Sequence, residues 1–161
     1  MGVVFSCLKS NNEMKITEEF PRLYICPGNQ KNITLTIHND YNGERIWAKN
    51  ARSRKSWLDI NRNDIMIFGN KEYGYNHIGI VKRKRIIDEN EDNWPFRSPS
   101  GTPWIYTFSM DIYNVDISHQ KMCELRGWDD KHWQTQTEIT KDKNYDRFIN
   151  HIKTTYTDIP I

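Results

Sequence analysis

The chain has 161 residues, a mass of 19.3 kDa and a formal net charge of +2. This length fits one domain and is enough to bury an apolar core without disulfides or metal ions. Aromatic residues make up 12% of the sequence, which argues against disorder, because disordered chains lack the large apolar side chains that offset the entropy of ordering. The small net charge excludes a globally basic protein, so any affinity for nucleic acid must come from local clusters of Lys and Arg.

Cysteine usage and hydropathy indicate the compartment. Cys7, Cys26 and Cys123 are widely spaced and form no C-x-x-C motif, so we expect reduced thiols in an intracellular, cytoplasmic protein, or a nuclear one if the host is eukaryotic. No apolar run is long enough to cross a bilayer, and residues 1–8 lack the charged start of a signal peptide. The start MGVVFS also matches an acylation pattern, with Cys7 as a second lipid site, and this alternative stays open.

In chain order, the first half of the sequence predicts short strands around one helix. Residues 22–26 (RLYIC) form an apolar run typical of a strand, and a Pro-Gly pair ends it. Residues 29–40 predict a short helix or turn that starts with polar capping side chains. The segment ERIWAK (44–49) predicts a second strand, and residues 65–68 predict a buried strand after a polar turn.

The second half predicts a long strand, a loop, another strand and a final helix. Residues 77–87 begin apolar and change to four consecutive cations, so this strand is expected to leave the core as a basic edge. Residues 88–103 carry three prolines and predict a long surface loop, of the kind that is often functional. Residues 104–117 alternate like a strand or a bent pair, and residues 144–156 carry an apolar helical stripe. The predicted fold class is α+β, with a small curled mixed β-sheet or open barrel flanked by helices.

Several kinds of chemistry are absent from the sequence. There is no phosphate-binding G-x-x-x-x-G-K-[ST] loop, no G-x-G-x-x-G and no G-x-S-x-G nucleophile motif. The histidines show no metal-ligand spacing, so no metal or other cofactor is expected. Asp59, Asp64 and His77 are the mid-chain acid/base candidates, and their spacing fits no reaction geometry. The sequence therefore predicts a protein that is not an enzyme.

The sequence contains aromatic and basic residues close to one another in place of a catalytic motif. Trp47 ends a predicted strand just before the basic segment 49–55, and Trp94 and Phe96 lie in the Pro-rich loop. Exposed aromatic rings beside Lys and Arg are suited to stacking a nucleic-acid base while the cations bind phosphate. Most tryptophans of a small domain belong to the core, and we assign Trp57 and Trp104 to packing.

The order of these features resembles the YTH domain and its EVE relatives in the PUA-like superfamily. The segments that carry the resemblance run from residue 22 to about residue 156, with residues 1–20 as an N-terminal extension of a single domain, and they are YICPGNQKNITLTI, IWAKN, DIMIFGN with HIGIV, NWPFR, WIYTF and ELRGWDDKHWQTQTEITKD. YTH domains hold a methylated adenine in an aromatic cage, and microbial EVE and YTH-like domains serve as specificity modules of modification-dependent restriction systems. The resemblance implies a PUA-like fold and a modified-base reader.

The resemblance also implies site residues. Trp47, Trp94 and Phe96 would be the walls of the cage, and Asn32, with Asn29 and Ala48, would read the edge of the base. Lys141 stands where the family commonly has a phosphate-contacting Arg, and a Lys there would make a weaker contact. The other expected phosphate contacts are Lys49, Arg52, Arg54, Lys55, Lys82, Arg83, Lys84 and Arg85.

The function expected from the sequence is the non-enzymatic reading of a modified base, N6-methyladenine first, in DNA or RNA that is flipped or single-stranded. The expected setting is a modification-dependent restriction system, in which a larger effector such as a motor or nuclease would be the partner. Two alternatives stay open: an RNA-binding regulator of methylated transcripts, and a basic protein-interaction module without a base pocket. No membrane partner is expected.

Overall fold

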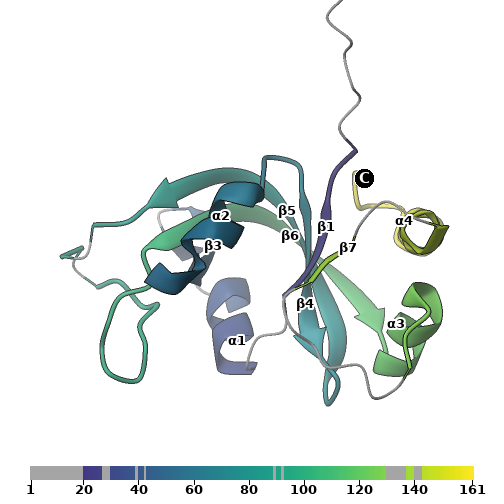
Figure 1. Ribbon diagram of the computed structural model, residues 1–161, viewed down its shortest axis with the longest axis horizontal. Coiled ribbons are helices and arrows are strands. Elements are labelled where there is room, and N and C mark those ends of the chain that lie inside the picture. The colour runs from purple at the N-terminus through teal and green to yellow at the C-terminus, as the bar shows by residue number, and fades with distance from the viewer. Residues whose placement is uncertain are drawn as a thin grey trace, which may run out of the picture.

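The computed structural model describes residues 20–26, 30–38, 40–41, 43–88, 90–91, 93–129, 137–139 and 143–161. The elements in chain order are β1 (Leu23–Cys26), α1 (Gln30–His38), β2 (Asp40–Tyr41), β3 (Glu44–Lys49), the 3-10 turn η1 (Ala51–Ser53), α2 (Arg54–Asp59), β4 (Ile65–Asn70), β5 (Gly74–Ile86), β6 (Tyr106–Ile117), α3 (His119–Arg126), β7 (Thr137–Ile139) and α4 (Lys143–Thr155) (Figure 1). None of the helices in these ranges has the length and apolar character needed to span a bilayer.

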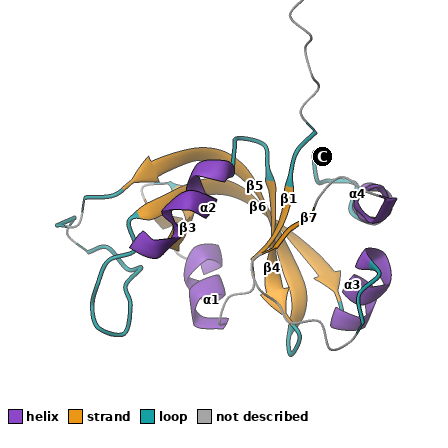
Figure 2. Ribbon diagram, in the orientation of Figure 1, coloured by secondary structure: helices purple, strands orange, loops and turns teal. Residues whose placement is uncertain are grey.

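The strands of the described residues form one mixed sheet in the order β2-β3-β6-β5-β4-β1-β7 (Figure 2). Strands β1 and β4 run parallel, which the intervening helical connections allow, and the other neighbours run antiparallel. Helices flank this sheet on both sides (Figure 2). The predicted α+β class with a small mixed sheet is confirmed.

The sheet is curled because its two longest strands are bent. Register shifts interrupt the pairing of β5 with β6 between Val81 and Arg83, and that of β4 with β5 between Phe68 and Gly69. Such bulges bend a strand and increase its twist. In the described pairing, β4 ends its ladder with β5 at Ile80, so the basic segment beyond the bulge pairs with β6 alone. The prediction that this strand emerges as a basic edge is confirmed.

One face of the sheet carries the core that α3 and α4 cover, which we call the α3–α4 core. Its strand residues alternate along each strand, as the two-residue period of β structure requires. Helices α3 and α4 lie together on one side of the sheet (Figure 1). They contribute the buried stripe of α4 and the apolar side of α3. The members are Leu23, Ile25, Ile65, Ile67, Tyr75, Ile78, Val115, Ile117, Met122, Leu125, Tyr145, Phe148, Ile152 and Ile159.

The opposite face carries a second core under α1 and α2, which we call the α1–α2 core. It contains Tyr24, Cys26, Ile33, Trp47, Trp57, Ile60, Met66, Phe68, Val81, Tyr106, Phe108 and Met110. A third, smaller cluster lies on the face of the α3–α4 core, but at the β3 end of the sheet. We call it the loop core, and its buried members are Ile46, Ala48, Ile87, Trp94 and Phe96.

The C-terminal helix confirms the predicted stripe: Tyr145, Phe148 and Ile152 are buried, and Ile149 packs against the same core. Helices α2 and α3 were not predicted. The signals of α3 are visible in the sequence, since the Ser118 Oγ caps its first turn by accepting from the Lys121 N–H at 3.1 Å. Gly127 ends the helix in a left-handed conformation at φ 66°.

We expect Phe148→Ala to lower the free energy of unfolding by about 3–5 kcal/mol, because Phe148 is fully buried between α4 and the sheet and its loss would leave a cavity. Urea unfolding followed by circular dichroism measures this. The exposed neighbour Asn150, changed to Ala, is the control and should shift stability by no more than about 0.5 kcal/mol. Equal effects of the two substitutions would contradict the packing of α4 described above.

Candidate nucleic-acid interface

Strand β3 presents Trp47 and Lys49 to the α1–α2 face, because residues two apart share one side of a strand. Trp47 is 8% exposed, and its ring lies 5.0 Å from that of Phe68 at a 57° tilt. Among the described residues, no group accepts a hydrogen bond from the Trp47 indole N–H. The indole is thus mostly packed, while its N–H is available to a ligand.

Trp94 and Phe96 lie in the loop core and are each only 3% exposed. Their ring centroids are 5.2 Å apart, and Tyr41 packs edge-on against Trp94 at 5.1 Å. The Trp94 indole N–H donates to the Trp104 carbonyl at 3.1 Å. These aromatic side chains form a small closed core under the loop, although the sequence predicted them to be exposed.

The predicted cage of Trp47, Trp94 and Phe96 around one slot is therefore wrong. Trp47 belongs to the α1–α2 core, whereas its neighbours Ile46 and Ala48 face the loop core that holds Trp94 and Phe96. The sheet separates the two sets, because adjacent side chains of a strand point to opposite faces. Trp57 was assigned to packing, and its 9% exposure in the α1–α2 core confirms this assignment; Trp104 is half-buried against the loop core.

The base-edge residues have separate positions. Ala48 is buried in the loop core at 3% exposure, and its role at the base edge stays a prediction. Asn32 is half-buried in the first turn of α1, and its role at the base edge stays a prediction. Asn29 and Lys141 lie outside the described residues.

Lys49 is a buried cation, and its contact with phosphate stays a prediction. Its side chain is in the α1–α2 face, the residue is 8% exposed, and its ammonium donates to the Ser56 Oγ at 2.8 Å. Burial lowers the pKa of Lys49, because the charged form loses its hydration. Burial also raises the pKa of the nearby Cys26 thiol to about 12, against the opposing effect of the Lys49 charge.

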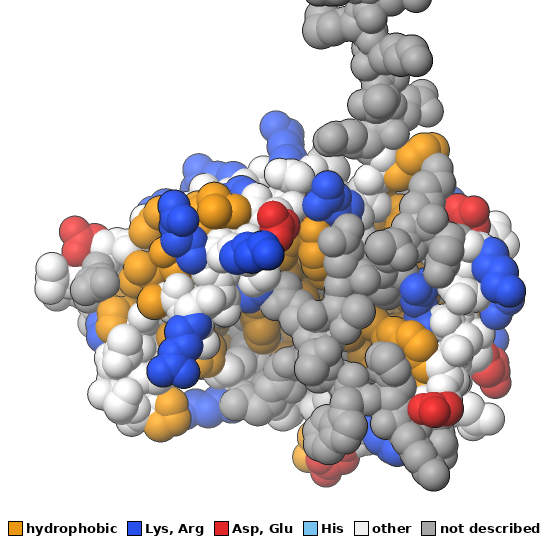
Figure 3. All heavy atoms as spheres, in the orientation of Figure 1, with side chains coloured by type: hydrophobic (Ala, Val, Ile, Leu, Met, Phe, Trp, Pro, Cys, Tyr) orange, Lys and Arg blue, Asp and Glu red, His pale blue; other side chains and the backbone are white. Residues whose placement is uncertain are grey.

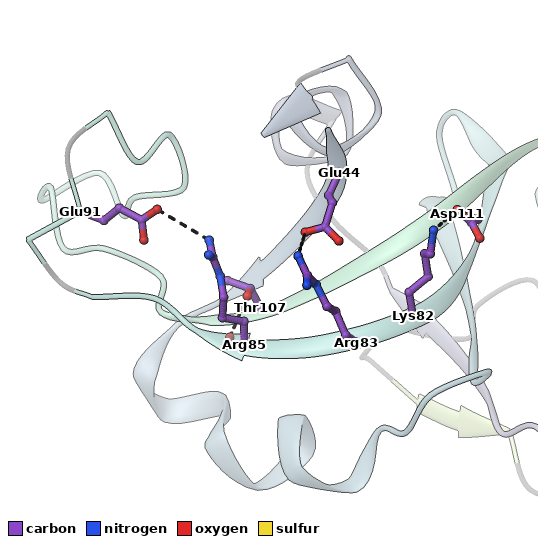
Figure 4. Close-up of polar contacts among 7 residues, drawn as sticks. All are labelled: Glu44, Lys82, Arg83, Arg85, Glu91, Thr107 and Asp111. Carbon is purple, nitrogen blue, oxygen red and sulfur yellow. Dashed lines mark hydrogen bonds and ion pairs between the residues drawn. The ribbon is translucent and has the colours of Figure 1, made fainter. Parts of the chain in front are cut away.

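The cations of β5 do not form one patch, although the sequence predicted a phosphate-binding cluster. Lys82 pairs with Asp111 at 3.1 Å, Arg83 with Glu44 at 2.5 Å and Arg85 with Glu91 at 3.6 Å (Figure 4). Arg85 also lies over the Tyr41 ring at 5.9 Å. Each of these three cations is thus already paired with a carboxylate. A phosphate would have to compete with that carboxylate for the contact.

Lys84 points to the other face and contacts α2. Its ammonium donates to the carbonyls of Trp57 and Leu58, at 3.1 and 2.9 Å, and lies 5.0 Å from the centre of the Trp57 ring. A cation is favourable there, because the last carbonyls of a helix carry partial negative charge. The Trp57 indole N–H in turn donates to the Thr107 carbonyl at 3.0 Å. These contacts fix α2 against the sheet.

Arg52, Arg54 and Lys55 are exposed on η1 and α2. Blue Lys and Arg side chains lie over this part of the surface (Figure 3). No carboxylate pairs with them within the described part of the chain. They follow directly on β3, the strand that carries Trp47. We call this group the η1–α2 cluster, and its contact with phosphate stays a prediction.

Two of the acid/base candidates, Asp64 and His77, can be described from their surroundings. The Asp64 carboxylate is 4% exposed and accepts from the backbone N–H groups of Arg22 and Asn61, at 2.9 and 2.7 Å. Burial lowers the pKa of His77, and the charge of His38 lowers it further. In the described ranges, no group of three or more His, Cys, Asp or Glu side chains is placed to hold a metal ion.

No protein-family model and no curated protein matches the sequence. Solved structures do match. The Pho92 YTH domain in complex with m6A superimposes with a TM-score of 0.56, at 15% identity over 86% of this chain and 87% of that one. The chain has the fold of YTH domains.

Two further structures agree. The YTH domain of the Zygosaccharomyces rouxii MRB1 protein, in complex with N6-methyladenosine RNA, matches with a TM-score of 0.54 and 12% identity over 84% of this chain and 88% of that one. The N-terminal domain of Thermococcus gammatolerans McrB, bound to m5C DNA, matches with a TM-score of 0.57 and 11% identity over 84% and 99%. The predicted YTH-like fold is confirmed.

We expect Cys26 to resist iodoacetamide at pH 8 in the folded protein, because its pKa of about 12 keeps the buried thiol protonated and only the thiolate attacks. Mass spectrometry of tryptic peptides measures the labelling, and the same reaction in urea gives the accessible reference. Rapid native labelling of Cys26 would contradict the packing of the α1–α2 core around Trp47.

Proposed function

We propose that this chain is a non-enzymatic reader of a modified base in DNA or RNA, with N6-methyladenine as the first candidate. The observation that carries the proposal is the η1–α2 cluster, three exposed cations without a carboxylate partner among the described residues, directly after the strand that holds Trp47. The fold adds support, because its neighbours include domains whose structures hold m6A, N6-methyladenosine RNA or m5C DNA.

In the proposed mechanism, Trp47 is one surface of the base site. Its packed position makes the ring rigid, and the unpartnered N–H gives it a donor toward the ligand. Stacking a base on an aromatic ring contributes about 1–3 kcal/mol, and this must offset the few kcal/mol that flipping a base from a duplex costs. A single-stranded target avoids most of that cost.

Recognition of the modification needs more than the methyl group itself. Burying one methyl contributes about 0.8 kcal/mol, which is roughly a fourfold preference. Greater discrimination requires that the unmodified base leave a polar group unpaired or water trapped in the site. Asn32 at the start of α1 is the described polar side chain that we propose for the edge of the base.

We further propose that the chain acts inside the cell as the specificity domain of a modification-dependent restriction system, with a motor or nuclease as effector. The likeness to the McrB N-terminal domain bound to m5C DNA supports a DNA ligand, and the YTH complexes support an RNA ligand. An RNA-binding regulator of methylated transcripts is the alternative on the same fold.

The decisive experiment is a binding titration with matched DNA and RNA oligonucleotides that carry N6-methyladenine, 5-methylcytosine or no modification, at two salt concentrations. We expect tighter binding of one modified strand than of its unmodified match at both salts, because salt screens phosphate contacts but not stacking. Equal affinity for all strands, modified or not, would contradict a reader and support a basic protein-interaction module.

Trp47→Phe should lower the affinity for the modified strand and spare the fold, because Phe keeps an aromatic ring in the α1–α2 core but removes the indole N–H and part of the stacking area. Isothermal titration and a thermal melt on the same sample separate the two effects. An unchanged preference for the modification with a normal melt would exclude Trp47 from the base site.

The double variant Arg54→Gln/Lys55→Gln should weaken binding of all strands alike and flatten the dependence of log K on log salt by about 1.4, since each lost contact to a single strand removes about 0.7. The matched control is Lys143→Gln/Lys153→Gln on α4, which removes the same charge from exposed positions on another helix. Equal slopes for the two double variants would contradict a role of the η1–α2 cluster in phosphate binding.

A further inference from the structure

A polar pocket lies at the start of β1, and the proposed base site makes no use of it. Its volume is about 390 Å³, and it is lined by Phe20, Pro21, Arg22 and the turn that joins α2 to β4. The turn contributes Asn61, Arg62 and Asn63. A pocket of this size fits a small ligand or one unit of a polymer.

The floor of this pocket is rigid because the Asp64 carboxylate ties its two walls together. One oxygen accepts from the Arg22 N–H at 2.9 Å and the other from the Asn61 N–H at 2.7 Å. The backbone adds three bonds: Ile65 N–H donates to the Arg22 carbonyl at 2.8 Å, Asn63 N–H to the Val81 carbonyl at 2.8 Å, and Val81 N–H to the Asp64 carbonyl at 3.0 Å. These bonds hold the two walls of the pocket together.

The walls combine two guanidinium groups with an exposed aromatic ring. Phe20 is 52% exposed, and Arg22 and Arg62 are exposed beside it. A single exposed Phe needs no explanation, but a Phe and two Arg around one polar pocket match the chemistry of a nucleotide. The ring offers a stacking face to a base, and the planar guanidinium forks offer paired donors to a phosphate.

The pocket continues the basic surface of α2. The Arg22 guanidinium donates to the carbonyl of Asp59, the last residue of α2, at 3.5 Å, and the Asn61 side chain donates to the same carbonyl at 3.3 Å. Arg54 and Lys55 begin the helix that Asp59 ends, and Lys84 contacts the carbonyls between them. Cations therefore border α2 from η1 to the pocket, whereas the whole chain has a net charge of only +2.

We infer that the pocket of Phe20, Arg22 and Arg62 binds a nucleotide that flanks the modified base, with its base stacked on Phe20 and its phosphate on the two arginines. This inference rests on the proposed function, and it sets the path of the bound strand along α2 toward the start of β1. The pocket reads no modification, since stacking and phosphate contacts are open to every nucleotide.

The test compares Phe20→Ala with Tyr73→Ala, an exposed aromatic residue in the turn between β4 and β5 that is 53% exposed. On a modified single strand of about nine nucleotides, within the range that one domain covers, Phe20→Ala should lower the affinity about tenfold or more. On the modified nucleotide alone, which has no flanking nucleotide, Phe20→Ala should have no effect. Tyr73→Ala should match the wild type on both ligands.

An abasic residue placed at each flanking position in turn locates the contact. One position should lose the same factor in the wild type as Phe20→Ala does, and the two losses should not add, because both remove the same stack. Arg62→Gln should flatten the salt dependence of the long strand by about 0.7 and leave that of the single modified nucleotide unchanged.

The outcomes separate the two proposals. If the wild type prefers the modified strand but Phe20→Ala binds the long strand as the wild type does, the pocket proposal is overturned and the reader stands. If Phe20→Ala and an abasic flank each lose affinity and the losses add, the contact lies elsewhere and the pocket proposal also falls. If the wild type binds no oligonucleotide, both proposals fall together.

Discussion

The side chains of β3 alternate between the two faces of the sheet, and this alternation decides which residues can share one binding surface. Ile46 and Ala48 face one side of the sheet and Trp47 and Lys49 the other, so a single strand contributes to two separate cores. The indole therefore meets α1 and α2, while the aromatic residues of the loop between β5 and β6 close a core of their own on the far side. A ligand that stacks on Trp47 must therefore approach from the α1–α2 face. The cations of η1 and α2 lie on the same face.

The same alternation sorts the charges of β5. Arg83 and Arg85 alternate with Lys84, so the run of four basic residues is divided between the two faces of the sheet. The members on the loop side meet carboxylates from β3, β6 and the loop, and Lys84 meets the end of α2. The four basic residues are consecutive in the sequence, but in the structure they do not form one surface and are not equally open to a ligand. The cations of η1 and α2 have no carboxylate partner among the described residues, and a short helix holds them in solvent.

The fold could be predicted from the sequence where the pattern is local. Apolar runs marked β1, β3 and β4 almost to the residue, and the stripe of Tyr145, Phe148 and Ile152 marked α4. Helix α2 escaped prediction because its segment, RKSWLD, shows charge but only one large buried residue, Trp57, and so has no apolar stripe. The site was harder to predict. The burial of Trp94 depends on Tyr41 from strand β2 and on Phe96 and Trp104 from the folded loop. A resemblance in the order of motifs could identify the fold but could not show which aromatic rings share a side of the sheet.

The loop between β5 and β6 is closed on itself. Ile87 and Ile105 are joined at its base by a hydrogen bond of 2.9 Å, and the Arg97 guanidinium holds its interior by donating to the carbonyls of Trp94 and Gly101. Within the tip, the Ser98 N–H donates to the Thr102 carbonyl, the Gly101 N–H to the Ser98 carbonyl and the Thr102 N–H to the Ser98 Oγ. Exchange or lengthening of that tip would leave the underlying strands nearly undisturbed, which makes it a natural place for divergence between homologues and a suitable attachment point for a fluorescent label.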